Sequence, residues 1–179
     1  MTDFSTLVQR RRSHRLFQPA EVSADDVRLI LRAGLMSPTS KSARAWHFVV
    51  VDDADKLQKL ADAKDAGAQF IGKAAFAIAV CANPLLCDCW IEDCSCAAMC
   101  MQLQAEDLNL GSCWAQIRGR HLSDGTSSVE VVRGILNLPA DMEVLCLLGF
   151  GRKGQDRPMQ NEDRLKWENV HVNTFSNEE

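Results

Sequence analysis

The sequence predicts a three-layer α/β/α sandwich, in which helices cover both faces of a β-sheet. Segments with a helical spacing of apolar residues alternate along the chain with short, β-rich apolar runs, and this alternation is typical of sandwiches of this kind. The chain has 179 residues, of which 46% are hydrophobic, so it is expected to form a single domain over 1–179. The alternation leaves open whether the sheet is parallel or mixed.

The first half of the chain contains one clear helix and two strands. A helix is expected over 23–36, because Ser23 and two aspartates resemble a helix start and apolar residues then recur at helical spacing until Pro38. Residues 46–51 and 74–82 are apolar, β-rich runs that end in polar turns. Both runs are therefore expected to be buried strands.

The second half is expected to be built around one core helix. Residues 90–108 are too continuously apolar for a surface helix, and Gly111 follows in the manner of a helix C-terminal cap. Strands are expected over 112–117 and 143–150. Ser127 and Glu130 stand at capping-box spacing for a helix that runs to Leu136, and the polar stretch 151–163 is expected to be a loop.

Charge and hydropathy exclude several classes of function. The 20 basic and 24 acidic residues give a formal charge of −4, which argues against a general affinity for nucleic acid. No run approaches the roughly 20 apolar residues of a membrane-spanning helix, and the charged start does not resemble a signal peptide. A cytoplasmic protein that binds no membrane is therefore expected.

Eight cysteines are many for a chain of this length, and five of them gather between Cys87 and Cys100. Without an export signal, reduced thiols are expected rather than disulfides. These thiols could hold a zinc ion or an iron–sulfur cluster, or they could have a structural role. The spacing disfavours a metal site, because Cys94 and Cys96 fall on different faces of the expected core helix, where cysteine packs as a small hydrophobe.

Three polar segments are candidates for a binding site. The basic run 10–15 is either a solvated charge cluster or a group of guanidinium and hydroxyl donors that bind a phosphate-bearing ligand. The loop 37–46 is dense in hydroxyls and ends at Trp46, which suits a pocket for a planar polar ring. In the segment 111–120 a strand ends in a glycine turn, where backbone N–H groups can approach a ligand closely.

Taken together, these segments resemble the FMN-dependent nitroreductase family, and especially its short single-domain members. The resemblance spans about residues 4 to 158 in the family's order and spacing. The matching motifs are Arg11-Arg12-Ser13-His14-Arg15-Leu16-Phe17, Pro38-Thr39-Ser40-Lys41-Ser42-Ala43-Arg44-Ala45-Trp46, Trp90-Ile91-Glu92-Asp93, Leu110-Gly111-Ser112-Cys113-Trp114, Gly134-Ile135-Leu136-Asn137-Leu138-Pro139 and Leu147-Leu148-Gly149-Phe150-Gly151.

The resemblance implies a mixed α+β sheet flanked by helices and an intertwined homodimer, in which residues 152–179 pack on the partner subunit. It also implies two FMN sites at the subunit interface. Arg11, Arg12 and Ser13 correspond to contacts with the FMN phosphate and ribityl chain, Arg15 to a contact with the pyrimidine edge, and Arg157 to a further phosphate contact. The resemblance also implies cofactor contacts from a loop that reaches the partner subunit's site, formed by Pro38, Thr39, Ser40 and Ser42. The last implied contacts come from the turn that faces flavin N5, formed by Gln116, Ile117, Arg118 and Gly119.

Two positions depart from the family pattern. The usual Asn is Ser42 here and the usual Pro is Ala45. A serine reaches less far than an asparagine and offers one donor where the amide offers two. The resemblance therefore implies weaker FMN binding at this loop.

The function implied by the resemblance is that of an FMN-dependent NAD(P)H oxidoreductase. Its acceptor is expected to be a nitro compound, a quinone or a related small molecule, and because donor and acceptor share one flavin face, ping-pong kinetics are expected. No catalytic side chain and no metal ligand is assigned, because the flavin carries the chemistry. Two alternatives stay open: a reductase or dehydrogenase for one dedicated metabolite, and a flavin- or metal-binding redox sensor that uses the cysteines between Cys87 and Cys100.

Overall fold

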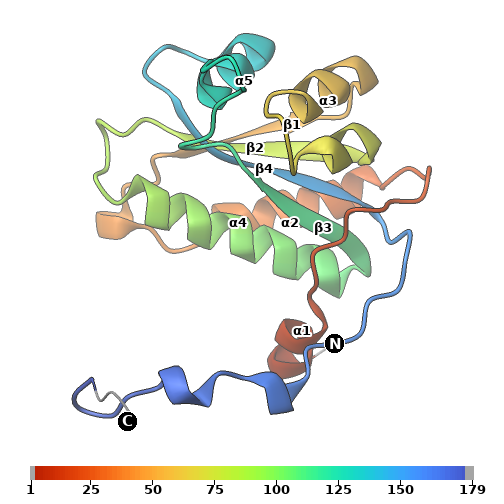
Figure 1. The fold of residues 1–179 in the computed structure, drawn as a ribbon, viewed down its shortest axis with the longest axis vertical. Coiled ribbons are helices and arrows are strands. Elements are labelled where there is room, and N and C mark those ends of the chain that lie inside the picture. Colours follow the sequence, from red (N-terminus) through yellow and green to blue (C-terminus); the bar gives the residue numbers. More distant parts are fainter. Residues whose placement is uncertain (1–2, 176–179) are drawn as a thin grey trace.

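The computed structural model describes residues 3–175 and forms three layers (Figure 1). The middle layer is a four-stranded sheet with the strand order β1-β2-β4-β3, in which every neighbouring pair is antiparallel. Its strands are β1 (Trp46–Val51), β2 (Phe76–Ala82), β3 (Leu110–Gln116) and β4 (Glu143–Arg152). A parallel bridge between Ser13 and Ser112 makes the sheet mixed at its β3 edge. The expected three-layer fold class is thus confirmed.

Helices cover the two faces of the sheet in pairs. Figure 1 shows α2 (Ala24–Leu35) and α4 (Trp90–Asp107) on one face, and α3 (Ala54–Ala61) and α5 (Ser128–Leu136) on the other. Each face has its own apolar cluster, one around Met101 of α4 and one around Leu57 of α3. Strands β2 and β4 are almost wholly buried because they lie in the centre of the sheet, between both clusters. No helix of the described residues is long and apolar enough to cross a membrane.

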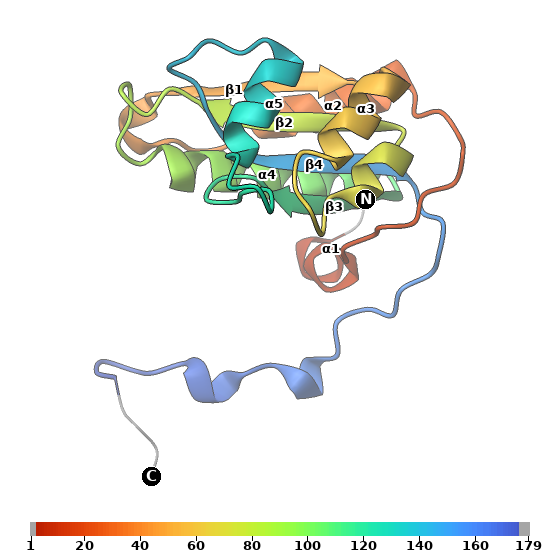
Figure 2. The same ribbon diagram turned by 45° about the horizontal axis from the view of Figure 1, so that its top comes forward.

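The first helix and the start of the segment after β4 lie together beside the β3 edge, where the Gln160 N–H donates to the Gln9 carbonyl at 2.9 Å. The short helix α1 (Phe4–Arg10) lies there, and the segment after β4 passes it before extending away from the body of the molecule (Figure 2). That segment contains two short 3-10 turns, Glu162–Arg164 and Trp167–Asn169. Its apolar side chains are exposed in the single chain, among them Trp167 at 70% and Phe175 at 77%.

Four local expectations need correction. Strand β1 is not buried, because it is an edge strand that pairs only with β2. Asn109, with φ 57°, and not Gly111, is the left-handed residue after α4. The Ser127 side chain makes no capping hydrogen bond, although α5 begins where expected. Strand β4 continues to Arg152, so the polar loop begins later than 151.

Candidate functional site

An extended segment between α1 and α2 lies against the start of β3. The His14 N–H donates to the Ser112 carbonyl at 2.9 Å, and Ser13 and Ser112 form the parallel bridge. Gly111 permits this approach, because a Cβ there would lie 2.9 Å from the Cβ of His14. This close contact is the reason for a glycine at 111, where the sequence suggested a helix cap. Because this segment is extended, its successive side chains point alternately to two opposite sides.

The odd-numbered side chains of this segment face the Cys113 thiol. Burial raises the pKa of Cys113, while the charges of Arg15 and Arg11 and a hydrogen bond from the Ser13 side chain act in the opposite direction. These three groups, from alternate positions, are therefore gathered along β3. Among the described residues neither Arg11 nor Arg15 has a carboxylate within ion-pair distance. The arrangement presents two uncompensated guanidinium groups and one hydroxyl on the same side.

The even-numbered side chains point to the chain's C-terminal segment. The Arg12 guanidinium donates from Nη1 to the Pro158 carbonyl at 2.7 Å. His14 is only 2% exposed and lines a small pocket of about 220 Å³, which Arg157 also lines. Arg12 thus lies close to Pro158, the residue that follows Arg157. This contact is on the side of the segment away from Arg11, Ser13 and Arg15.

A buried carboxylate organises that pocket. Glu106, in the last turn of α4, is 4% exposed and pairs with Lys153 at 2.8 Å and with Arg10 at 3.5 Å. Lys153 also donates to the Asn109 side chain at 3.3 Å. Because a buried carboxylate without a partner costs several kcal/mol, these ion pairs fix α1 and the residue after β4 against the end of α4.

The predicted segment 111–120 ends in the turn that follows β3. The N–H groups of Ile117 and Arg118 both donate to the Leu145 carbonyl at 3.1 Å, and the Arg120 N–H closes the turn on the Ile117 carbonyl at 3.0 Å. Gly119 has φ 69°, and nothing lies within 4 Å of where its Cβ would be. The Gln116 side chain bridges the Trp114 indole N–H and the Arg118 carbonyl. The turn is therefore rigid and open above Gly119.

The predicted segment 37–46, which is the loop between α2 and β1, is strained. Lys41, Ser42 and Arg44 all have φ near +50°, which is costly for residues other than glycine. The loop is held by the Ser40 N–H, which donates to Asp93 of α4 at 2.8 Å, and by Thr39, whose hydroxyl accepts from the Arg44 N–H at 3.2 Å. Pro38 and Ser42 are exposed.

Two buried polar atoms at the ends of this loop have no hydrogen-bond partner among residues 3–175. They are the Ser37 hydroxyl and the Trp46 indole N–H. A buried donor without an acceptor destabilises the fold by about 1–3 kcal/mol. Contacts with the described residues of this chain thus leave two polar groups of the loop unsatisfied.

This loop and the arginine segment lie at opposite ends of α4. Ser40 is bound to Asp93 in the first turn of the helix, whereas Arg10 pairs with Glu106 in its last turn. Thirteen residues of helix separate these anchors by about 20 Å. Within one chain the loop therefore does not join Arg11, Ser13 and Arg15.

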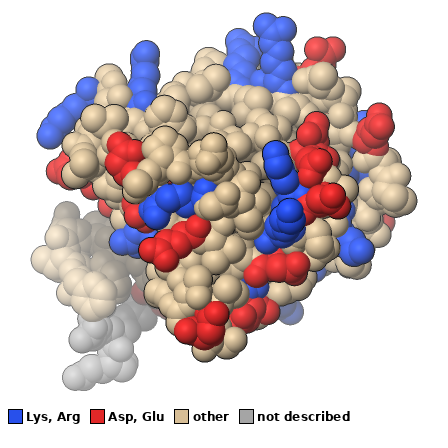
Figure 3. Space-filling view, turned by 90° about the horizontal axis from the view of Figure 1, so that it is seen from above, with Lys and Arg blue, Asp and Glu red and all other residues tan. Residues whose placement is uncertain are grey.

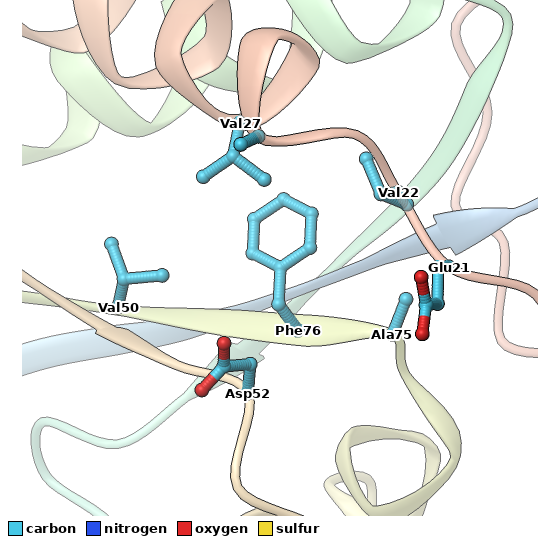
Figure 4. A pocket seen from close by; sticks show the side chains of 8 residues that line it. Glu21, Val22, Val27, Val50, Asp52, Ala75 and Phe76 are labelled. Carbon is cyan, nitrogen blue, oxygen red and sulfur yellow. The ribbon is translucent and has the colours of Figure 1, made fainter.

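The pocket in Figure 4 lies elsewhere. It has a volume of about 460 Å³ and opens between the start of α2, the end of β1 and the start of β2. In Figure 4 the Phe76 ring points toward Val27, and the carboxylates of Glu21 and Asp52 lie at the rim. None of the predicted cofactor-binding residues lines it. Figure 3 shows the face over α3 and α5, on which basic and acidic side chains are interspersed without a patch of one sign.

Five of the eight cysteines are buried, namely Cys81, Cys87, Cys94, Cys113 and Cys146. Burial raises the pKa of Cys81 and Cys94 to about 12 and that of Cys146 well above its ordinary value. The Cys87 thiol is also buried and donates to Asp93 at 3.5 Å. Among residues 3–175, no group of three or more His, Cys, Asp or Glu side chains is placed to hold a metal ion. Within the stretch from Cys87 to Cys100, the buried thiols of Cys87 and Cys94 do not favour the redox-sensor alternative. Cys96 is exposed, contrary to its expected place in the core, and Cys89 and Cys100 are partly buried.

Comparison with known proteins identifies the family. Residues 8–91 and 88–152 match the sequence profile of the nitroreductase family. A protein of Archaeoglobus fulgidus with the provisional name NADH dehydrogenase/NAD(P)H nitroreductase is 29% identical over 176 residues, which cover 96% of this chain and 98% of the relative. The chain therefore belongs to the nitroreductase family.

Solved structures agree with this assignment. The structure of an FMN-dependent nitroreductase from Clostridium difficile R20291 is 37% identical, with a TM-score of 0.93 over 94% of this chain and 98% of that chain. A crystal structure from Bacteroides thetaiotaomicron VPI-5482, provisionally named NADH dehydrogenase/NAD(P)H nitroreductase, is 30% identical, with a TM-score of 0.87 over 96% of this chain and 97% of that chain.

Sequence reasoning missed four residues that organise the site. Asp93 anchors the loop, and Glu106 and Lys153 fix the arginine segment to α4. Lys64, from the segment after α3, donates to the Gln116 carbonyl at 3.2 Å. The signal available in the sequence was the pair of acidic residues at 93 and 106 in a helix expected to lie in the core, because a charge at a core position requires a partner.

His14→Gln is expected to flatten the pH dependence of stability. Burial, reinforced by the charges of Lys153 and Arg157 against that of Glu106, lowers the pKa of His14 below its ordinary 6.5. Stability linked to this imidazole is therefore complete above pH 6.5 and is lost as the pH falls through the lowered folded-state pKa, because the unfolded chain takes up the proton first. Urea unfolding at about pH 7.5, 6 and 5 measures this slope. Equal slopes for the variant and the wild type would contradict the assignment.

Proposed function

We propose that this protein is an FMN-dependent NAD(P)H oxidoreductase that reduces nitro compounds, quinones or related small acceptors. The observation that carries the proposal is the set of Arg11, Ser13 and Arg15 on one side of a segment bonded to β3, without acidic partners in the described structure. Guanidinium and hydroxyl donors suit a phosphate dianion and the polar edge of a flavin. The similar Clostridium difficile protein, described as FMN-dependent, supports the same cofactor.

The chemistry of the donor set fits FMN residue by residue. Arg11 and Ser13 would hold the phosphate and ribityl chain, and Arg15 would hold the pyrimidine edge. The turn Gln116–Gly119 would face the flavin ring, since Gly119 leaves open space there. Arg12 and Arg157 are proposed as weaker phosphate contacts, because in this chain both lie on the other side of the segment, where Arg12 donates to the Pro158 carbonyl and Arg157 lines the pocket beside His14.

Bound FMN would supply the redox chemistry by accepting a hydride from NAD(P)H and passing reducing equivalents to the acceptor. The residues of this chain bind and orient it. The fixed positive charge of Arg15 would stabilise negative charge that develops at the pyrimidine edge during reduction. No side chain is proposed as a nucleophile, acid or base. Donor and acceptor would use the same face in turn, which predicts ping-pong kinetics.

A second copy of the chain is proposed to complete each site. The loop with Pro38, Thr39, Ser40 and Ser42 lies at the far end of α4 from Arg11, and two buried polar atoms beside it have no partner in the described part of the chain. The C-terminal segment exposes Trp167 and other apolar side chains, which suits burial against a partner. In a homodimer, residues 152–179 would pack on the other subunit and the loop would reach the other subunit's FMN. Ser42 in place of the family's Asn is expected to weaken that contact.

The absorption spectrum of the purified protein tests the cofactor. We expect a flavin spectrum, release of FMN on heating, and bleaching of the visible bands by NADH or NADPH with recovery on addition of a quinone. These results would follow from the donor set of Arg11, Ser13 and Arg15. A colourless protein that also fails to bind added FMN would contradict the proposal, and an iron–sulfur spectrum with acid-labile sulfide would favour the cysteine cluster instead.

Complementation between two defective chains tests the shared site. Arg11→Ala removes a hydrogen-bond donor on the β3 side. Ser40→Trp places a bulky side chain in the loop, so that the loop no longer fits against the other subunit's FMN. Each homodimer is expected to lose most of its FMN, whereas co-expression of the two variants should restore part of it, because a mixed dimer contains one site with both wild-type elements. Flavin content per chain, measured beside the oligomeric mass, is the readout. Co-expressed variants with no more flavin than the separate ones would contradict a site built from two subunits.

A further inference from the structure

The pocket of Figure 4 lies where the helices leave the end of the edge strand β1 exposed. Val50 is paired with Ile78 of β2, so both side chains lie on the sheet face that α2 and α4 cover. Ile78 is fully buried, whereas Val50 stays 40% exposed. The resulting cavity of about 460 Å³ is bounded by the sheet on one side and by Val22 and Val27 on the other.

The floor of this pocket is apolar and preformed. Phe76, at the start of β2, is 3% exposed, and its ring stacks on that of Phe150 with 4.9 Å between the centroids. In Figure 4 the Phe76 ring points away from the strand, with Val50 on one side and Val22 on the other. The cavity volume lies within the roughly 300–1,000 Å³ of small-molecule sites. A floor of this kind can accommodate a phenyl or branched alkyl group.

The charged side chains that line the pocket are both acidic. Glu21 precedes α2 and Asp52 follows β1, and both carboxylates lie at the rim. Neither of them forms an ion pair among residues 3–175. Lys73 lines an adjoining pocket together with Glu21, but no ion pair joins the two. Because a cleft lined by charges of one sign concentrates ions of the opposite sign, this rim favours a cation.

We propose that this pocket binds a small organic cation, namely a protonated amine that carries a phenyl or branched alkyl group. The apolar group would lie against Phe76 and Val50, and the ammonium group would lie at the rim beside Glu21 and Asp52. Burial of the apolar group supplies binding free energy, and the carboxylates select a positive charge. FMN binding is independent of this site, because none of the residues proposed to hold FMN lines it.

Calorimetric titration of the purified full chain with matched probes tests the site. 2-Phenylethylammonium carries both features of the ligand, whereas 2-phenylethanol lacks the charge and methylammonium lacks the apolar group. We expect saturable binding of 2-phenylethylammonium at one site per chain, and binding weaker by about tenfold or more for each of the other two probes. Added salt should weaken the binding of 2-phenylethylammonium and leave that of 2-phenylethanol unchanged.

Four variants separate the rim from the floor. Glu21→Gln and Asp52→Asn each remove one charge and keep a polar side chain of similar shape. Ala24→Trp, at the exposed first residue of α2, fills the cavity and leaves both carboxylates in place. Glu130→Gln, on α5 at the opposite face of the sheet, is the matched control for the loss of one negative charge. Thermal unfolding is recorded first for every variant, so that loss of the fold is separated from loss of the site.

Glu21→Gln and Asp52→Asn are each expected to weaken 2-phenylethylammonium binding about threefold or more and to leave 2-phenylethanol binding unchanged. Ala24→Trp should weaken the binding of both probes, and Glu130→Gln should behave as the wild type. The absence of saturable binding, an equal affinity for 2-phenylethanol, or an equal loss in Glu130→Gln would overturn the proposal. Binding by monomers but not by dimers, measured by native mass spectrometry, would also overturn it and assign the pocket to a contact between two copies of the chain.

Discussion

The hydrogen bond from the His14 N–H to the Ser112 carbonyl fixes the register of residues 11–15 along β3, and the candidate site depends on this register. Because an extended segment alternates its side chains, a shift of one residue would exchange the two sides. Arg11, Ser13 and Arg15 would then lie against the C-terminal segment, and Arg12 and His14 would lie beside Cys113. The pattern of charges that suits FMN exists only in the observed register.

Several contacts hold that register. Gly111 leaves room for the His14 Cβ, and Gly154 does the same on the other flank, where a Cβ would lie 2.9 Å from the Leu16 backbone. Glu106 joins α1 and Lys153 to the end of α4. The core helix α4 therefore has two roles. Its buried face packs on the sheet, and its two ends position the arginine segment and, through Asp93, the loop that is proposed to serve the other subunit.

The sequence allowed much of this architecture to be predicted, but not the contacts that organise it. The helix 23–36 and the strand 46–51 follow from local spacing and caps, which is information that lies within the segment. The exposure of β1 depends on its place at the sheet edge, and the use of Gly111 depends on His14, almost a hundred residues earlier. Lys64 was not singled out, because only the fold brings it to the turn after β3, where it donates to the Gln116 carbonyl.

The dissociation constant for FMN in single variants of the arginine segment is the most direct measurement of the central claim, which is that the ligand lies on the side of Arg11, Ser13 and Arg15. Arg11→Gln and Arg15→Gln should each weaken FMN binding about tenfold or more, since each removes charge-assisted hydrogen bonds. Arg12→Gln should change it much less, because Arg12 donates to the Pro158 carbonyl on the other side. Equal losses for all three, or a larger loss for Arg12→Gln, would contradict this account of the site.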